Sequence, residues 1–249
     1  MEELQHNNKR VVEMNGVKKS FNGNQVLKDI NFTLDKGENL VVLGKSGTGK
    51  SVLIKCLVRL IEADEGEIIT FEKNILQANR AELTELRGKI GFLFQGGALY
   101  DSMTVRENLE FPVRRKKKNS EKGDIDKLVE EVLDNVGLKD TIDKMPSELS
   151  GGQRKRVSLA RTLIMKPELI LYDEPTTGLD PVTSQEISEL ILEVQEKYGT
   201  AAIIITHDIK CAEITANRAM LIDDGTFIVE GTIEDLKRSP DPKVNLFFK

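Results

Sequence analysis

The fold is decided by Gly44-Lys45-Ser46-Gly47-Thr48-Gly49-Lys50-Ser51. This stretch fits the phosphate-loop pattern of a glycine, four residues of any kind, and then Gly-Lys-Ser. The apolar run 40–43 precedes it, and apolar residues recur at helical spacing from Val52 to Leu60 behind it. A strand, a glycine-rich turn and a helix are the setting in which the pattern carries meaning, so we interpret it as a phosphate site rather than a chance turn.

The residue types of this loop suit phosphate chemistry. Glycines let the backbone approach a phosphate closely, and successive N–H groups at a helix start supply partial positive charge. We expect Lys50 to contact the β- and γ-phosphates and Ser51 to contact Mg²⁺. The remaining loop residues and Val52, which follows it, are expected to surround the nucleotide.

The composition indicates a globular protein with one substantial core. The chain has 249 residues, 39% hydrophobic and 31% charged, which allows one α/β domain with a substantial core, or one core plus a subdomain. Its net charge of −5 gives no reason to expect a nucleic-acid partner. No apolar run approaches the roughly 18 residues of a membrane span, and the first residues do not resemble a signal peptide. We therefore predict a cytoplasmic protein; if it acts at a membrane, another chain must hold it there.

The two cysteines fit the same compartment. Cys56 and Cys211 lack the spacing of a metal site, and a reducing compartment is the default for such a chain. We expect both to be small core residues on helices.

Continuous apolar strands alternate with helices along most of the chain. Residues 40–43, 169–172 and 201–205 are such strands, which indicates a parallel sheet buried on both faces. Short antiparallel strands with a turn at 22–24 are expected over 11–33, and helical patterns dominate 96–166. A last helix at 233–238 should precede a polar tail. The division is about 10–95 and 167–230 for the core and β-subdomain, 96–166 for a helical subdomain, and 231–249 for the C-terminal helix and tail.

Three apolar strands end at residues suited to a nucleotide: Gly44, Asp173 and His207. Parallel sheets bind ligands at the carboxyl ends of their strands. Asp173 is placed to hold Mg²⁺, and Glu174 could polarise the attacking water, although two acids after a strand could also simply start a helix. His207 could hold that water near the γ-phosphate, and Gln95 could contact Mg²⁺ and link to the helical subdomain.

A second glycine-rich helix start lies far along the chain, at Leu149-Ser150-Gly151-Gly152-Gln153. Ser150 is a suitable N-cap, so the helix behind it presents another anion-binding terminus. One phosphate does not need two distant helix starts from one fold. We therefore expect this terminus to close over a nucleotide held by another subunit.

Two further features are open to two interpretations each, and a third indicates a helix start. Phe21 is either a core residue or an aromatic that stacks on a flat base. Asp180 is an N-cap before Pro181. The basic run 114–118 is either a solvated helix face or a contact for anionic lipid headgroups.

In this order, the motifs resemble those of the ATP-binding cassette (ABC) ATPases over about residues 11–236. The resemblance identifies Gly44–Ser51 as Walker A, Gln95 as the Q-loop residue, Leu149–Gln153 as the signature and Leu169–Asp173 as Walker B. It also implies that Glu174 is the catalytic glutamate, Gly178–Asp180 the D-loop, His207 the switch histidine and Phe21 the adenine-stacking aromatic. The implied fold is α/β: a P-loop NTPase, RecA-like core with an N-terminal antiparallel β-subdomain and an inserted helical subdomain. The implied assembly is a head-to-tail homodimer with two ATP and Mg²⁺ at its interface.

A finer resemblance comes from residues 94–113, Phe-Gln-Gly-Gly-Ala-Leu-Tyr-Asp-Ser-Met-Thr-Val and onward. This stretch looks like that of the Mla-type ATPases, which serve permeases associated with Mce-domain proteins. It implies phospholipid movement between membranes, with the chain bound to the inner face of the cell membrane through a permease. Arg59 and Ala63 depart from that subgroup's usual Gly and Pro, and Gln153 stands where some members carry Met.

We therefore expect an ATPase subunit that dimerises on ATP and drives a permease through residues 98–113. Leu99 and Tyr100 are either exposed apolar anchors there or part of the local core. A cassette for metals, amino acids or drugs is the main alternative. A soluble cassette acting on DNA or ribosomes is disfavoured by the single cassette and the net negative charge.

Overall fold

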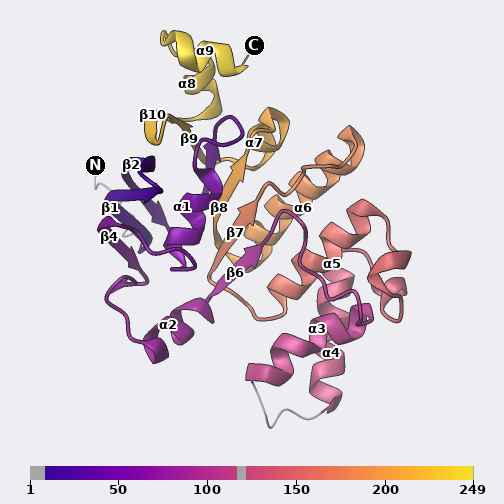
Figure 1. Ribbon diagram of the computed structural model, residues 1–249. Coiled ribbons are helices and arrows are strands. Elements are labelled where there is room, and N and C mark those ends of the chain that lie inside the picture. The colour runs from indigo at the N-terminus through magenta and orange to yellow at the C-terminus, as the bar shows by residue number, and fades with distance from the viewer. Residues whose placement is uncertain (1–8, 117–121, 249) are drawn as a thin grey trace, which may run out of the picture.

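The computed structural model describes residues 9–116 and 122–248 (Figure 1). Lys117 and Lys118, the last two residues of the basic run, lie outside the described residues. None of the helices described is both long and apolar enough to cross a membrane.

The centre of the molecule is a parallel sheet. Its strands are β3 (Asn39–Leu43), β6 (Ile90–Leu93), β7 (Leu169–Asp173) and β8 (Ala201–Thr206), in the spatial order β3-β8-β7-β6. Every residue of β3, β7 and β8 is buried, as their uniformly apolar sequences predict for strands covered on both faces. In register, Leu43 pairs with Thr206 and Asp173 with Ile205, so these three strands end at one edge.

Six further described strands extend this sheet on one side. They are β1 (Arg10–Phe21), β2 (Asn24–Asp35), β4 (Glu65–Thr70), β5 (Lys73–Asn74), β9 (Arg218–Asp223) and β10 (Thr226–Gly231). β9 runs parallel to β3, whereas β1 with β2, β1 with β4, β4 with β5 and β9 with β10 are antiparallel pairs. The described strands form one ten-stranded sheet in the order β5-β4-β1-β2-β10-β9-β3-β8-β7-β6. The predicted hairpin around residue 22 is present, but its strands have 12 residues each and are longer than expected.

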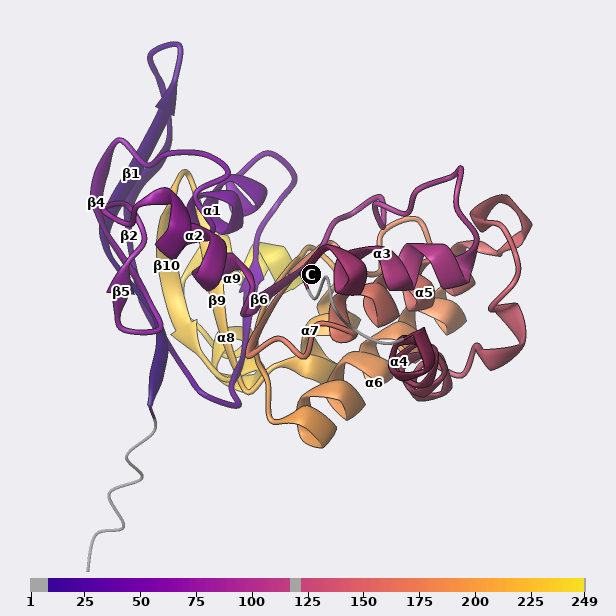
Figure 2. The same ribbon diagram turned by 90° about the horizontal axis from the view of Figure 1, so that it is seen from below.

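Helices cover the sheet and form a separate lobe. Those near the sheet are α1 (Lys50–Leu57), α2 (Arg80–Arg87), α6 (Pro181–Tyr198), α7 (Ile209–Thr215), α8 (Ile233–Lys237) and α9 (Pro242–Phe248). The lobe contains α3 (Val105–Lys116), α4 (Lys122–Asn135), α5 (Gly151–Leu163) and two 3₁₀ turns, Lys139–Thr141 and Pro146–Glu148. Figure 2 shows β1, β2, β4 and β5 at one end of the molecule and α3–α5 at the other. The predicted fold class is confirmed.

Alternate side chains of the central strands belong to two cores. Val41 and Leu43 pack with residues of α3–α7, whereas Leu40 and Val42 pack with α1 and the antiparallel strands. The period of two residues in a strand explains this division. Cys56 and Cys211 are buried as expected, and burial raises the pKa of each thiol to about 11.

The predicted polar tail is wrong, because residues 242–248 form α9. Asp241 accepts a hydrogen bond from the Lys243 amide at 2.8 Å, and Pro242 occupies the first helical turn. Val244 is fully buried, which is worth roughly 2 kcal/mol. Capping and apolar packing therefore make the segment helical.

The segment after β6 resolves the two alternatives for Leu99 and Tyr100. Leu99 is partly buried and packs against the core, so it is not an exposed anchor. Tyr100 is 41% exposed, and its ring lies 5.2 Å from that of Phe111 and 4.7 Å from the Arg161 guanidinium. Only Tyr100 of the pair is therefore available to a partner.

The described part of the basic run lies at the end of α3. Arg114–Lys116 are exposed, and Arg114 pairs with Glu110 at 2.8 Å. Lys116 donates to the Gly88 carbonyl at 3.3 Å. The described portion is therefore a solvent-exposed helix end, and exposure is compatible with either interpretation of the basic run.

Candidate functional site

The predicted phosphate loop connects β3 to α1. Gly49 is the N-cap of α1 and adopts the left-handed conformation, with φ of 99°. A Cβ at Gly49 would lie 3.0 Å from the Val26 carbonyl oxygen, and one at Gly44 would lie 2.8 Å from Ile222 Cγ2. Gly49 therefore needs glycine for its backbone conformation and for close packing, and Gly44 needs it for close packing alone.

The loop leaves donors free for an anion. No side chain caps the start of α1, and within the described residues the amides of Ser46, Gly47 and Gly49 have no acceptor. Lys50 is 5% exposed, and its ammonium donates to the carbonyls of Gly44 at 2.7 Å and Lys45 at 3.0 Å. A helix start with free amides and a buried cation suits a bound phosphate.

Asp173 and Ser51 meet beside this loop. The Ser51 hydroxyl donates to Asp173 Oδ1 at 2.9 Å. Burial raises the pKa of Asp173, and the bond from Ser51 partly opposes that rise. The described residues contain no cluster of three or more His, Cys, Asp or Glu of the kind that would cage a metal by itself. One carboxylate and one hydroxyl suit Mg²⁺, which is commonly held by few protein ligands together with phosphate oxygens and water.

The Glu174 carboxylate also lies at the phosphate loop, and the backbone conformation of this residue is unusual. It is a non-glycine residue in the left-handed region, with φ of 50°, and its amide donates to the Ile205 carbonyl at 2.9 Å. Its Oε2 lies 2.8 Å from His207 Nδ1, and its Oε1 lies 3.4 Å from Lys50 Nζ. Strain of this kind is often kept at functional sites. The carboxylate thus lies between a lysine and a histidine.

These side chains surround one pocket of about 760 Å³. The sequence-predicted residues that line it are Phe21, Lys45, Ser46, Gly47, Gly49, Lys50, Ser51, Val52, Gln95, Glu174 and His207. Gly44, Thr48 and Asp173 lie next to it, since Asp173 bonds Ser51 and Thr48 donates to the Lys45 carbonyl. Phe21 is 41% exposed, with Lys19 Nζ 5.2 Å from the ring centroid, so it is a pocket wall rather than a core residue.

Gln95 connects the pocket to the helical lobe. Its carbonyl accepts a hydrogen bond from the Lys155 ammonium of α5. Lys155 is 7% exposed, and burial lowers its pKa while the carboxylates of Asp173 and Glu174 oppose that change. A buried cation therefore ties α5 to the strand end that carries Gln95.

The second glycine-rich helix start lies elsewhere. Among the described residues, none of Ser150–Gln153 lines the pocket. The Ser150 hydroxyl accepts from the Gln153 amide at 3.2 Å, and the Gln153 side chain accepts from the Ser150 amide at 3.0 Å. In this reciprocal capping box, side chains of the same chain accept hydrogen bonds from two backbone amides at the start of α5.

Asp180 also lies outside the pocket, beside the second helix start. Its Oδ1 accepts from the amides of Val182 and Thr183, each at 3.0 Å. The Thr183 hydroxyl lowers the pKa of Asp180 further by donating to its carboxylate. A Cβ at Gly152 would lie 2.5 Å from Thr183 Cγ2, so α5 and α6 begin side by side.

Three pocket residues were not predicted: Val26, Thr177 and Phe247. Thr177 donates to Glu174 Oε2 at 3.2 Å. Its position three residues after Glu174 was the feature of the sequence that could have identified it as a pocket residue. Phe247 reaches the pocket from α9, which the Asp-Pro pair at 241–242 and the apolar spacing behind it could have revealed. Nothing in the sequence around Val26 indicates that it lines a pocket.

Known proteins resemble this chain over most of its length. A family model described as "ABC transporter" matches residues 27–177. The probable ribonucleotide transport ATP-binding protein mkl of Mycobacterium tuberculosis (strain ATCC 25618 / H37Rv) is 40% identical over 238 residues, 95% of this chain and 66% of that protein. This chain therefore spans slightly less than two thirds of that relative's length.

Two further matches cover nearly the full length of both proteins. The L-cystine import ATP-binding protein TcyC of Bacillus subtilis (strain 168) is 38% identical over 237 residues, 92% of this chain and 94% of that protein. A solved dimeric ATP-binding cassette in a post-hydrolysis state, bound to ADP and Pi, has a TM-score of 0.82 at 31% identity. That match covers 89% of this chain and 98% of the solved one.

Proposed function

This chain belongs to the ATP-binding cassette (ABC) transporter family, and from that premise we propose that it hydrolyses ATP in a head-to-tail dimer that drives a membrane permease. The observation that carries the proposal is the convergence of Lys50, Asp173, Glu174 and His207 at the phosphate loop. The chain would lie on the inner face of the cell membrane, held there by the permease.

The half-site in one chain supplies most of the chemistry. The loop amides and Lys50 bind the β- and γ-phosphates, while Ser51, Asp173 and Gln95 hold Mg²⁺. When bound, Mg²⁺ neutralises phosphate charge. Phe21 stacks on the base.

Hydrolysis uses the residues at the strand ends. A water attacks the γ-phosphorus, the bond to the bridging oxygen of ADP breaks, and Glu174 accepts the proton of that water. Lys50 stabilises the charge that develops on the phosphoryl group. His207 lies beside Glu174 and holds the water and the carboxylate in position.

The second half of each site comes from the other subunit. Ser150–Gln153 start a helix that is exposed at Ser150 and lies off the chain's own pocket, next to Asp180. A helix start binds anions, so in a head-to-tail dimer it would close over the γ-phosphate of the partner's ATP. The solved cassette with ADP and Pi that this chain resembles is itself dimeric.

The permease would dock where the helical lobe meets the core. A groove of about 260 Å³ lies there, lined in part by Phe92, Phe94, Pro112 and Met165. The rings of Phe92 and Phe94 stack with centroids 4.1 Å apart, and Phe94 is 36% exposed. An exposed apolar groove beside the Gln95 strand end would couple a bound helix to the nucleotide.

Phospholipid is the substrate that we propose, with an Mce-domain protein as an accessory subunit. The support is the sequence of residues 94–113, which includes the exposed Tyr100. Import of an amino acid is the second candidate, because TcyC, named for L-cystine import, matches over 94% of its length.

Membrane pull-down tests the coupling and the substrate together. The tagged chain should capture a permease from native membranes, Tyr100→Glu should lose it, and Leu60→Glu, a charge at a 53% exposed residue, should keep it. The captured complex should carry phospholipid, and phospholipid should stimulate its ATP hydrolysis. Stimulation by an amino acid but not by phospholipid would select the second candidate. Tyr100 adjoins the groove through Arg161, which lines it. Capture unaffected by Tyr100→Glu would therefore reject this docking surface.

A further inference from the structure

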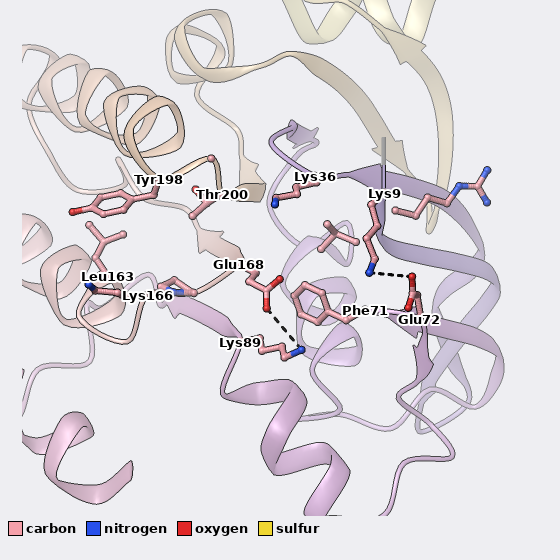
Figure 3. A pocket seen from close by; sticks show the side chains of 14 residues that line it. Lys9, Lys36, Phe71, Glu72, Lys89, Leu163, Lys166, Glu168, Tyr198 and Thr200 are labelled. Carbon is pink, nitrogen blue, oxygen red and sulfur yellow. Dashed lines mark ion pairs between the residues drawn. The ribbon is translucent and has the colours of Figure 1, made fainter. Parts of the chain in front are cut away.

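A second cavity lies at the opposite edge of the sheet from the phosphate loop. It has a volume of about 480 Å³ and adjoins the starts of β7 and β8 (Figure 3). Four separate stretches reach it, over residues 9–11, 71–72, 163–168 and 198–200, together with Lys36 and Lys89. Its size falls within the range of small-molecule sites.

The lining of this cavity carries an excess of positive charge. Its ionic side chains are Lys9, Arg10, Lys36, Lys89, Lys166, Glu72 and Glu168. Five cations and two anions leave a formal charge of +3 in a chain whose net charge is −5. The local charge is therefore opposite in sign to that of the whole chain, which favours an anion here.

Two of these lysines lack an acidic partner. Lys9 pairs with Glu72 at 3.2 Å, and Lys89 lies 3.8 Å from Glu168. Over residues 9–116 and 122–248, neither Lys36 nor Lys166 has a carboxylate within 4.0 Å. Figure 3 shows the Lys89 ammonium beside the Phe71 ring and the Lys36 side chain reaching toward Thr200.

An aromatic ring forms part of the cavity wall. Lys89 Nζ lies 5.4 Å from the centroid of the Phe71 ring, and Leu163 and Pro167 are buried neighbours on the facing side. A flat apolar group can therefore lie against this wall while its charged end reaches the lysines.

The backbone around the cavity is strained. Phe71, Glu72 and Lys166 have φ of 50°, 65° and 50°, in the left-handed region that non-glycine residues rarely adopt. Each such residue costs about 1 kcal/mol or more. Phe71 and Glu72 form the two-residue turn between β4 and β5, where Asn-Gly is usual. The chain thus holds three side chains at this cavity at a cost in stability.

We propose that this cavity binds a small organic anion that has a phosphate, sulfate or carboxylate head and a flat apolar body. Lys36 and Lys166 contact the head, with Lys9 and Lys89 nearby, and the body lies against Phe71. The site is separate from the nucleotide pocket and does not depend on the proposed transport function.

Phenyl phosphate is the probe, because it has the minimal head and body. The chain is first saturated with a non-hydrolysable ATP analogue and Mg²⁺, and phenyl phosphate is then titrated by saturation-transfer NMR. We expect saturable binding that is tighter than that of inorganic phosphate or benzyl alcohol and that weakens as salt is raised. Lys36→Glu/Lys166→Glu should weaken it about tenfold or more, as expected when two charge-assisted contacts are lost.

A matched variant separates the cavity from general charge. Lys127→Glu/Lys144→Glu makes the same charge change at two exposed lysines outside the cavity and should leave binding unchanged. If the reversed pair lowers the melting temperature, Lys36→Ala/Lys166→Ala takes its place. Three results would overturn the proposal: no saturable binding, equal weakening by the control pair, or binding that the ATP analogue abolishes. The lysines would then serve only to offset the negative ends of α5 and α6, which finish at this edge.

Discussion

The two glycine-rich helix starts of this chain are similar in sequence and opposite in structure. At the start of α1, Gly49 provides no side-chain cap, and Lys50 is buried against the carbonyls of its own loop. At the start of α5, Ser150 and Gln153 complete a capping box, and Ser150 is exposed. The first start is left open for a ligand within its own pocket, whereas the second is satisfied by its own residues and faces outward.

This difference supports the proposed division of the hydrolysis site between two chains. Lys50, Asp173, Glu174 and His207 are assembled before any second chain arrives. The α5 start has no lysine or carboxylate of the pocket beside it and instead lies against the start of α6. Changes at the first region should therefore damage binding and chemistry in one chain, and changes at the second should act only in the dimer.

The largest effect is expected at Lys50. Lys50→Ala should weaken ATP binding by roughly 10- to 100-fold and lower hydrolysis by about 1,000-fold or more, because the charge facing the β- and γ-phosphates is lost. Fluorescent-nucleotide titration and phosphate release measure the two quantities. Lys127→Ala, at an exposed lysine, is the control. Unchanged binding in Lys50→Ala would mean that the loop does not hold the nucleotide.

Glu174→Gln should separate chemistry from binding within the same region. Hydrolysis should fall by about 100- to 10,000-fold because the base is lost, whereas ATP affinity should change little. Size-exclusion chromatography with ATP should then show a stable dimer. Glu193→Gln, at an exposed acid of α6, should behave like the parent. Hydrolysis at the parental rate would remove Glu174 from its proposed role.

Ser150→Arg tests the other side of the comparison. The arginine should keep the α5 start from the γ-phosphate of the partner's ATP and lower hydrolysis at that site by about 100-fold, while ATP binding to the monomer stays the same. Loss of the cap should also cost about 1 kcal/mol of stability. Thr232→Arg removes the capping side chain of α8 and adds the same charge, so it controls for both effects. Equal loss of binding and hydrolysis in Ser150→Arg would contradict a role across the dimer.

The smallest expected effect is a change in melting temperature, and it comes from the charge state of Asp173. Burial raises its folded-state pKa above the unfolded value, so the native state binds more protons between those two values. Stability from this group therefore falls as pH rises from the ordinary aspartate pKa through the raised one. Relative to the parent, nucleotide-free Asp173→Asn should gain on the order of 1–2 °C in Tm at pH 7 and less at pH 4.

Thermal melts at the two pH values, with and without Mg²⁺ and ATP, measure this change. The gain on adding Mg²⁺ and ATP should shrink in Asp173→Asn, because a metal ligand is lost. Asp140→Asn, at an exposed acid, should show neither effect. A nucleotide-free Asp173→Asn chain that melts below the parent at pH 7 would show that the buried carboxylate is stabilising.

Regular patterns explain why much of the fold could be predicted. The uniformly apolar runs of β3, β7 and β8 specify buried parallel strands, and Asp180-Pro181 marks the start of α6 correctly. The same Asp-Pro pattern stands at 241–242, directly before α9. The sequence therefore contains a local signal for α9 that the prediction of a polar tail did not include.

Features that depend on tertiary contact could not be predicted. The left-handed backbone of Glu174 follows from its amide bonding to Ile205 on a neighbouring strand. Lys155 becomes a buried cation only because α5 packs against the Gln95 strand end. The lysine-lined cavity joins residues 9 to 200, and no local pattern brings such distant segments together.

The central claim is that each hydrolysis site needs the phosphate loop of one chain and the α5 start of another. Lys50→Ala and Ser150→Arg chains, each inactive alone, should be mixed in equal amounts and assayed for phosphate release. A mixed dimer contains one intact composite site, so activity should recover to about a quarter of the parental value if the two sites act independently. A mixture no more active than its two components, although the chains dimerise together, would contradict the account.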